Sequence, residues 1–332
     1  MAQFLSKCSA NALADAAANL FAGGLVAFPT ETVYGLGADA CNADAVARVY
    51  SVKGRPADHP LIVHVASMDG LGDWADGVPG YAISLARDFW PGPMTLVVKR
   101  SGLAGDFVTG GQDTVGVRVP DHPVALGLIE AFVRAGGKGL AAPSANRFGN
   151  VSPTTAQAVS DELGDYLAEG DQILDGGACD IGVESTIIDC TGDVPKILRP
   201  GAITAQMITE STGLEVVQVV EENAIRVSGS LDSHYAPMAT VILDQTPVAG
   251  QGFIAMADVV ASDGVVRLAA PKTHDEFAKV LYSALRAADK RGLSTVVVHQ
   301  PAGRGIAIAI RDRIKRAETK TPNNSIDEGN HK

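Results

Sequence analysis

The sequence predicts an α/β protein of two domains, and three observations support this. Short apolar runs with the length of buried strands alternate with amphipathic helical segments along the chain. Its 332 residues suffice for two domains of roughly 150 residues each, and the alternation becomes simpler late in the chain. We therefore expect an α/β domain around a twisted mixed sheet over 1–210, a linker over 211–238, a smaller parallel α/β domain over 239–318 and a polar, disordered tail over 319–332.

Composition and charge narrow the class of protein. With 46% hydrophobic and 20% charged residues, the chain is typical of a globular protein in water. Its net charge of −11 argues against a broad nucleic-acid surface, so an anionic ligand needs a local basic pocket. The cysteines, Cys8, Cys41, Cys179 and Cys190, lack zinc spacing and indicate a reducing, cytoplasmic setting. We expect no signal peptide, no membrane span and no membrane partner.

Helices are predicted where apolar residues recur at helical spacing. The segments are 11–22, 44–52, 80–90, 275–288 and 305–317. Gly23 and Gly24 end the first helix, and Asn42 or Asp44 caps the second. Ser152 precedes a proline, so it is expected to cap a further helix whose start favours anions.

Strands are predicted from the short apolar runs. They cover 25–28, 61–63, 94–99, 183–189 and 196–199 in the first domain, and 240–243, 252–256, 265–269 and 295–298 in the second. The run over 114–120 alternates with a period of two, which places Thr114, Gly116 and Arg118 on one face. We expect the first domain's strands to be complete at Arg199 and no helix to fit between 244 and 252.

Polar groups at the strand ends are the candidate ligand contacts. Lys53 and Arg55 flank a glycine just before a predicted strand, and two cations at a strand end suit a polyphosphate. The alternative is a solvated Lys and Arg in a polar loop. Arg118 lies on a strand in an apolar context and needs a carboxylate partner, from either the protein or a substrate. A Thr/Glu turn follows the strand that ends at Phe28, and it brings hydroxyls and backbone amides to the carboxyl end of that strand, where ligands tend to bind in α/β folds.

Seven motifs together carry a resemblance to a known family. They are Phe28–Gly37, Lys53-Gly54-Arg55-Pro56, Trp90-Pro91-Gly92-Pro93, Arg118-Val119-Pro120, Ala142-Pro143-Ser144-Ala145-Asn146, Gly182-Val183-Glu184-Ser185-Thr186 and Leu198-Arg199-Pro200-Gly201. In this order the chain resembles the threonylcarbamoyl-AMP synthases, the YrdC-like family in its long, two-domain form. The linker motif His234-Tyr235-Ala236-Pro237 and the segment 274–317 match the long form. The resemblance implies a deep basic cavity in the first domain, a Rossmann-like second domain, and a linker that closes over the active site.

The resemblance also implies a reaction. L-threonine captures CO2 from bicarbonate as a carbamate, which attacks the α-phosphate of ATP to give threonylcarbamoyl-AMP and pyrophosphate. A separate transferase machinery then moves the threonylcarbamoyl group to an adenosine beside the tRNA anticodon. Mg²⁺ is implied by the triphosphate. The chemistry needs cations and exclusion of water, and it needs no covalent nucleophile. Stable binding of nucleic acid is not expected.

Site roles are carried over from the family's motifs. The catalytic residues would be Lys53, Arg55, Ser144 and Asn146. L-threonine would contact Thr32, His64, Arg118, Ser144 and Ser185. ATP would contact Lys53, Arg55, His59, Thr114, Ala142, Asn146, Ser152, Arg199, His234 and Tyr235. The alternatives are surface or core-edge ion pairs for the arginines, local backbone caps for the hydroxyls and a satisfied polar group for His64.

Two other functions stay open. A carbamoyl transferase of the hydrogenase-maturation type uses a related domain, but it carries acylphosphatase-like and zinc-finger modules that this sequence lacks. An RNA-binding module without chemistry is disfavoured by the net charge of −11. The sequence leaves open whether threonine is preferred over serine, because one methyl group separates them.

Overall fold

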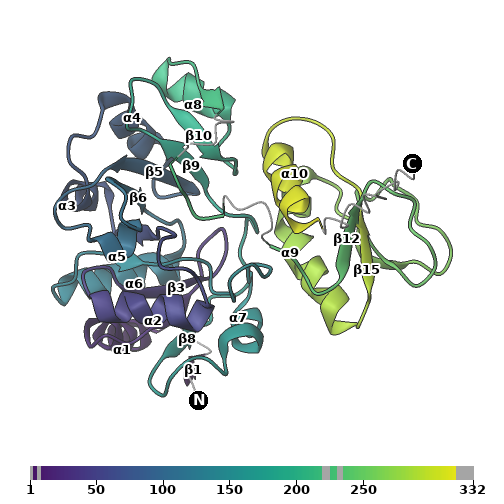
Figure 1. Ribbon diagram of the computed structural model, residues 1–332, viewed down its shortest axis with the longest axis horizontal. Coiled ribbons are helices and arrows are strands. Elements are labelled where there is room, and N and C mark those ends of the chain that lie inside the picture. The colour runs from purple at the N-terminus through teal and green to yellow at the C-terminus, as the bar shows by residue number, and fades with distance from the viewer. Residues whose placement is uncertain (1–2, 6–8, 219–224, 230–234, 319–332) are drawn as a thin grey trace, which may run out of the picture.

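Figure 1 shows the computed structural model as two lobes of unequal size. The structure describes residues 3–5, 9–218, 225–229 and 235–318. Each lobe is built on its own sheet, which confirms an α/β chain with two separate sheets. The predicted tail and His234 lie outside the described residues. None of the described helices combines the length and apolar character that a membrane span requires.

The large sheet mixes parallel and antiparallel neighbours, as predicted. In spatial order its described strands are β1 (Gln3–Leu5), β8 (Gln172–Leu174), β2 (Val26–Phe28), β3 (Gly35–Asp39), β7 (Leu140–Ala141), β4 (Ile62–His64), β6 (Thr114–Arg118), β5 (Met94–Lys99), β9 (Thr186–Asp189), β10 (Lys196–Arg199) and β11 (Val217–Gln218). Strands β4 and β6 run parallel, and His64 lies opposite Arg118 at their carboxyl ends. This register brings two predicted site residues to one edge of the sheet.

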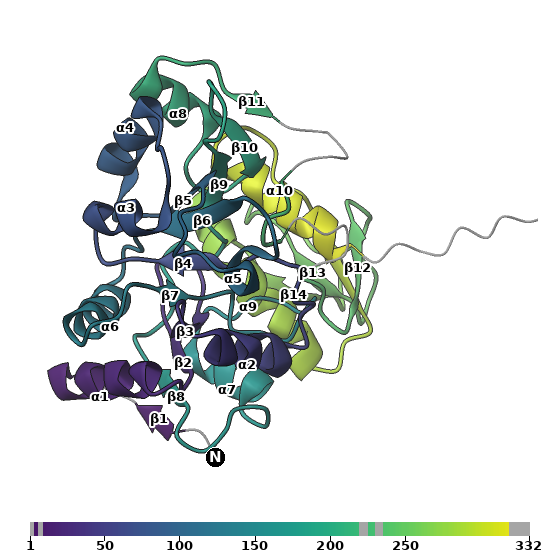
Figure 2. The same ribbon diagram turned by 60° about the vertical axis from the view of Figure 1, so that its left-hand side comes forward.

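Helices cover the large sheet. They are α1 (Ala10–Phe21), α2 (Ala43–Lys53), α3 (Leu71–Trp74), α4 (Gly80–Phe89), α5 (Asp106–Thr109), α6 (Pro123–Arg134), α7 (Ala156–Leu163) and α8 (Ala205–Thr212), with one 3-10 turn, η1 (Met68–Gly70). Figure 2 shows α1 and α6 side by side, and Leu20, Phe132 and Phe28 share a core between these helices and β2. Apolar burial of this kind is the main force that holds the helices on the sheet.

Local sequence fixes the ends of α2, and so the position of the cationic loop. The side chain of Asn42 accepts hydrogen bonds from the amides of Asp44 and Ala45, as an N-cap does. The helix ends at Lys53 because Gly54 follows in the left-handed region with φ of 62°. Lys53 therefore belongs to the last helical turn, and Arg55 begins the loop that leads to β4.

The predicted helix start at Ser152 is wrong. Helix α7 begins at Ala156, and Thr155 caps it by accepting a hydrogen bond from the amide of Ala158. The hydroxyl of Ser152 instead donates to the carboxylate of Glu184 at 2.6 Å. A charge-assisted hydrogen bond to a buried carboxylate is stronger than a bond to a helix amide, so the hydroxyl turns inward.

The prediction that the first domain's strands end at Arg199 is also wrong. Strand β11 pairs in parallel with β10, with Lys196 opposite Val217. It has only two residues, too short a run to give a strand pattern in the sequence. The large sheet therefore extends into the segment that the sequence assigned to the linker.

The second domain matches its predicted parallel architecture. Its strands lie in the order β12 (Thr240–Leu243), β15 (Thr295–Val298), β13 (Gly252–Ile254) and β14 (Val266–Ala269), and all neighbouring pairs are parallel. The helices α9 (His274–Lys290) and α10 (Ile306–Ala317) pack on this sheet. Within the described chain no helix separates β12 from β13, as predicted.

The two domains meet through α9 and α10, which Figure 1 shows between the small sheet and the large lobe. One apolar cluster joins Val33, Val183 and Tyr235 to Phe277 and Leu281 of α9. A polar network around Glu184, which includes Tyr282 and Arg313, lies beside this cluster. The second domain therefore packs against two segments of the first domain, the one that directly follows β2 and the one that directly precedes β9.

The close approach at Gly182 provides a test of this packing. Gly182 has φ of +82°, and a Cβ atom there would lie 2.5 Å from the carbonyl oxygen of Ala278 in α9. We expect Gly182→Ala to push α9 outward. The free energy of unfolding should fall by about 1–3 kcal/mol beyond the loss that backbone strain alone causes. Gly177→Ala is the matched control, because Gly177 has φ of +88° with no atom within 4 Å.

Chemical denaturation and limited proteolysis of both variants would measure the difference. Earlier unfolding of the second domain and faster cleavage between the domains in Gly182→Ala alone support the packing. Equal losses in the two variants would contradict it.

Candidate active site

Side chains from several strand ends converge on one cavity in the first domain. Its lining includes the five residues predicted to contact threonine, together with three from the predicted ATP set and one of the linker serines. They are Thr32, His64, Arg118, Ser144, Ser185, Ala142, Arg199, Tyr235 and Ser228. His64 ends β4, Arg118 ends β6, Arg199 ends β10, and Ser185 directly precedes β9. The structure thus brings together residues as far apart in the sequence as Thr32 and Tyr235.

Arg118 is held by a protein carboxylate. Its Nη2 atom lies 2.6 Å from Oε1 of Glu31, and both side chains are buried. Its Nη1 donates to Thr32 Oγ1 at 3.0 Å and its Nε to the carbonyl of Gly92 at 3.2 Å. The core-edge ion pair considered from the sequence is therefore present. Arg118 also faces the cavity, so it can meet a second carboxylate from a ligand.

Two pairs of hydrogen-bonded hydroxyl groups lie at the cavity wall. Thr30 and Thr32 share a hydrogen bond between their Oγ1 atoms at 2.8 Å. Ser185 Oγ lies 2.8 Å from Thr95 Oγ1 and accepts a hydrogen bond from Arg199. Hydroxyls can both donate and accept, so this wall can match an amino acid's hydroxyl and amine.

Arg199 is a buried cation with neutral partners. Its Nε and Nη2 donate to the carbonyl of Ser185, and its Nη1 donates to the carbonyl of Ser228 at 2.7 Å. Burial lowers the pKa of its guanidinium, and the neighbouring Arg313 adds to that lowering. No carboxylate lies within ion-pair distance of Arg199 among the described residues. Its charge is therefore available to an anionic ligand.

Arg55 is the second such cation. It donates to the carbonyl of Pro60 at 3.0 Å and to Ser228 Oγ at 3.4 Å, and its Nε has no hydrogen-bond partner among the described residues. Its guanidinium lies 5.7 Å from the ring of Phe148. Burial lowers the pKa of Arg55 to about 10, so the side chain remains charged at neutral pH.

Lys53 lies apart from the cavity lining. Its ammonium group donates to the carbonyl oxygens of Ser144 at 2.6 Å and Asn146 at 2.5 Å, and the side chain is buried. Burial is the main cause that lowers its pKa well below the usual range, and nearby Arg55 adds to it. In this structure Lys53 therefore fixes the loop that carries Ser144 and Asn146.

The other predicted ATP contacts lie around this loop or above it. His59 packs edge-on against Phe148 at 5.4 Å, and Ala142 lines the cavity. Asn146 Nδ2 donates to the carbonyls of Arg147 and Asn150, which leaves its Oδ1 without a described partner. Tyr235 adopts φ of 66°, an uncommon conformation for a tyrosine, and stacks on Tyr282 at 5.6 Å.

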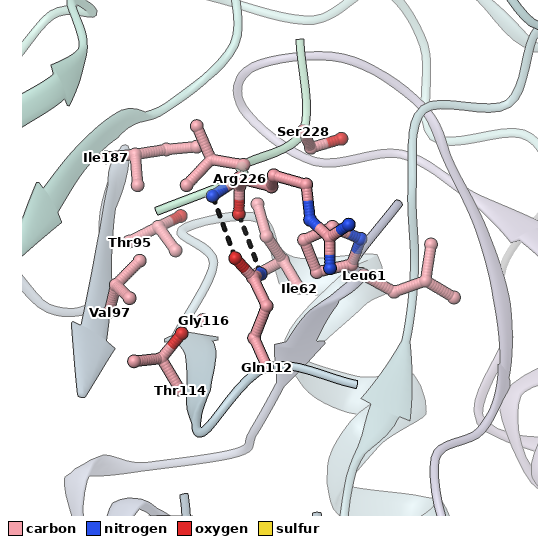
Figure 3. A pocket seen from close by; sticks show the side chains of 12 residues that line it. Leu61, Ile62, Thr95, Val97, Gln112, Thr114, Gly116, Ile187, Arg226 and Ser228 are labelled. Atoms are coloured by element: carbon pink, nitrogen blue, oxygen red, sulfur yellow. Dashed lines mark hydrogen bonds between the residues drawn. The ribbon is translucent and has the colours of Figure 1, made fainter. Parts of the chain in front are cut away.

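A second, smaller cavity adjoins the first, and Figure 3 shows its lining. It contains Thr114, and it shares Ile62 and Ser228 with the larger cavity. Gln112 holds the linker here: its amide donates to the carbonyl of Arg226 at 3.0 Å and accepts from that residue's backbone N–H at 2.9 Å (Figure 3). The described linker segment over 225–229 is thus fastened across the two cavities.

Glu184 lines the cavity but receives no role from the sequence. Its carboxylate accepts hydrogen bonds from Ser152, from Tyr282 at 2.9 Å and from Arg313 at 2.6 Å. Burial raises its pKa, yet Arg313 foremost and then Arg199 outweigh that effect and lower the pKa to about 2. A glutamate inside the predicted strand over 183–189 is a sequence signal for a buried partner. The partner, however, is 129 positions away in the sequence.

His64 is a neutral group in the cavity. It is 4% exposed, its ring meets Phe28 edge-on, and its Nδ1 has no partner among the described residues. Burial, and secondarily Arg118, lower its pKa to about 3. The imidazole is therefore uncharged at neutral pH and offers one free polar atom to a ligand.

Comparison with family models matches nearly the whole chain. A model described as "Telomere recombination" matches residues 18–201. A model described as "Threonylcarbamoyl-AMP synthase, C-terminal domain" matches residues 203–318.

Individual relatives agree with these matches. A threonylcarbamoyl-AMP synthase of Pyrococcus abyssi is 38% identical over 322 residues, which cover 89% of this chain and 90% of the relative. One of Bacillus subtilis is 39% identical over 326 residues, which cover 92% of each. The crystal structure of Pyrococcus abyssi Sua5 complexed with L-threonine superimposes with a TM-score of 0.85 at 36% identity, and covers 96% of this chain and 97% of that one.

The burial of neutral His64 predicts a pH-dependent stability. Its pKa is lowered on folding, so only the unfolded state takes up this proton as the pH falls below about 6.5, and stability is lost in that direction. The loss from this group is about 2 kcal/mol between pH 7 and pH 5. Glu184 adds little there, because its carboxyl titrates at lower pH in both states.

Urea unfolding at the two pH values would measure this effect. We expect the wild-type chain to lose about 2 kcal/mol more between pH 7 and pH 5 than His64→Gln does. The same pH dependence in both proteins would show that His64 takes up a proton in the folded state.

Proposed function

The chain belongs to the threonylcarbamoyl-AMP synthase family, and on this premise we propose that it makes threonylcarbamoyl-AMP and pyrophosphate from L-threonine, bicarbonate and ATP. The nitrogen of threonine bonds to the carbon of CO2, released from bicarbonate with loss of water, and gives a carbamate. A carbamate oxygen then attacks the α-phosphorus of ATP as the bond to the β-phosphate breaks. Because AMP is transferred from ATP to the carbamate, the reaction is that of a nucleotidyltransferase.

One observation carries the proposal. All five side chains assigned to threonine line a single cavity with the cation Arg199, which has no carboxylate partner among the described residues. Arg118 and the hydroxyls of Thr32 and Ser185 fit the carboxylate, amine and hydroxyl of an amino acid. Neutral His64 lies beside them without a charge that would repel the amine.

Two cations support binding of the triphosphate. Arg55 and Arg199 both contact Ser228, and neither has a carboxylate partner among the described residues. A guanidinium is the side chain best suited to bidentate phosphate contacts. Both cations can therefore contact phosphates that bind next to the linker at Ser228.

Magnesium would arrive with ATP as part of the substrate. Among the described residues no group of three or more His, Cys, Asp or Glu side chains could hold a metal ion. Glu31 and Glu184 line or adjoin the cavity, but each is paired with an arginine. The phosphates and water therefore supply most of the ligands for the ion, as is usual for Mg²⁺ with nucleotides.

The size of the cavity supports a linker that opens and closes. The larger cavity has a volume of about 40 Å³, which is enough for only a few water molecules. Ser228 and Tyr235 from the linker form part of its wall. We propose that these residues move to admit both substrates and then close over them, which excludes water from the labile carbamate.

The product's use is proposed from the family. A separate transferase would receive threonylcarbamoyl-AMP and modify tRNA beside the anticodon, so this chain need not hold tRNA itself. The acidic balance of the chain, with a net charge of −11, agrees with that division. We place the reaction in the cytoplasm, because Cys41, Cys179 and Cys190 are free thiols.

Pyrophosphate release from ATP is the direct test of the reaction. We expect release to require both threonine and bicarbonate, and serine to turn over less well because it lacks the methyl group. Release that depends on carbamoyl phosphate would instead indicate a carbamoyl transferase. No turnover with any of these substrates would contradict the proposed enzyme.

Arg55 provides a test of the phosphate site. A charged hydrogen bond is worth on the order of 1.5–3 kcal/mol, so Arg55→Ala should lower kcat/KM for ATP roughly tenfold or more. Arg55→Lys should recover only part of this, since an ammonium group cannot make a bidentate contact. Steady-state kinetics with varied ATP measure both effects.

The control for this experiment is Arg134→Ala, which removes an exposed arginine paired with Glu130 on α6. It should leave the kinetics unchanged. Wild-type kinetics in Arg55→Ala would reject the assignment of Arg55 to the phosphates.

A further inference from the structure

The strongest feature outside the predicted site is a buried ion pair between the two domains. Arg313 on α10 donates its Nε to Oε2 of Glu184 at 2.6 Å. The guanidinium has no exposed surface, and the carboxylate side chain is 7% exposed. The Nη2 atom of Arg313 donates to the carbonyl of Pro200 at 3.0 Å, and Pro200 directly follows Arg199. The second domain thus reaches the wall of the cavity through this side chain.

Other groups fix the geometry of the pair. Tyr282 on α9 donates to the same oxygen of Glu184, and Ser152 donates to the other oxygen. The guanidinium of Arg313 lies 5.4 Å from the ring centre of Tyr235, which stacks on Tyr282. Three aromatic or cationic groups from the linker and second domain therefore surround one carboxylate of the first domain.

Charge balance gives this arrangement a consequence for the cavity. Arg118 is balanced by Glu31 and Glu184 by Arg313. Arg313 also pairs with Asp312 on the same helix, and Asp312 has a second cation, Arg316, at 3.2 Å. Arg199 has no carboxylate within ion-pair distance among the described residues. Arg199 nevertheless lines the same cavity as Glu184, and after Arg313 it is the next cation that lowers the pKa of that carboxyl. Without Arg313, the buried carboxylate would attract Arg199, the other cation acting on it, since a buried charge is costly without a partner.

Building on the proposed function, we propose that Arg313 is a positioning residue for the active site: by neutralising Glu184 it leaves Arg199 free for the anionic phosphates of the nucleotide. The second domain then supplies a charge that the first domain's site requires, in addition to packing against it. Arg313 itself acts through Glu184 and makes no contact with the substrate.

This role differs from simple docking. Other ion pairs also join the domains, such as Lys290 with Asp161 at 2.7 Å, but the lysine there is 66% exposed and the pair lies outside the cavity lining. Loss of an exposed pair weakens the contact slightly and leaves the cavity charge unchanged. Loss of Arg313, in contrast, leaves the buried carboxylate of Glu184 without its paired cation.

The test compares variants that remove only the cation of the Arg313–Glu184 pair with variants that remove both charges or keep both. Arg313→Gln should raise the dissociation constant of ATP, measured by calorimetry, at least tenfold, and raise KM for ATP more than KM for threonine. The double variant Arg313→Gln/Glu184→Gln removes both charges and should recover most of that loss. Arg313→Lys keeps the cation and should stay close to the wild type. Lys290→Gln is the docking control and should change ATP binding less than twofold.

Two results would overturn the proposal. One is ATP binding by Arg313→Gln within twofold of the wild type. The other is a double variant that folds, as judged by its melting temperature, yet binds ATP as poorly as the single variant. If Arg313→Gln does not fold, Arg313→Lys and the double variant decide between charge and packing. A wild-type chain that binds ATP but releases no pyrophosphate in a threonine-dependent way would count against the proposed function instead.

Discussion

Two buried ion pairs, Arg118 with Glu31 and Arg313 with Glu184, set the net charge that the cavity offers to a ligand. A buried charge is expensive unless it is paired, so each carboxylate at the cavity holds one arginine. The remaining cations, Arg55 and Arg199, are left with neutral hydrogen-bond acceptors. They remain free to neutralise phosphates, and the chemistry proposed for this chain depends on that surplus.

The sheet topology explains why these groups meet. Parallel β4 and β6 bring His64 and Arg118 to the same edge, and β9 and β10 bring Ser185 and Arg199 beside them. The loop after β7 reaches this edge because Lys53 bonds two of its carbonyl oxygens. The linker then crosses the edge, and α9 and α10 close the side where Glu184 lies. The cavity is therefore a product of both domains.

Much of this arrangement can be predicted from the sequence, where the signal is local. Helix α2 follows from its Asn42 cap and Gly54 end, and the strand ending at His64 from a short apolar run. Interactions across long sequence distances leave no such signal. The pairing of Glu184 with Arg313 is one case, and it also explains why Ser152 donates to a carboxylate and does not cap a helix. Strand β11 is too short to have a pattern.

A structure of the full chain with a non-hydrolysable ATP analogue and L-threonine tests the central claim most directly. We expect phosphate oxygens within hydrogen-bond distance of Arg55 and Arg199, with threonine among Thr32, His64 and Ser185. We also expect Glu184 to stay paired with Arg313. Phosphates bound elsewhere, or a Glu184 carboxylate that pairs with Arg199 in the complex, would contradict it.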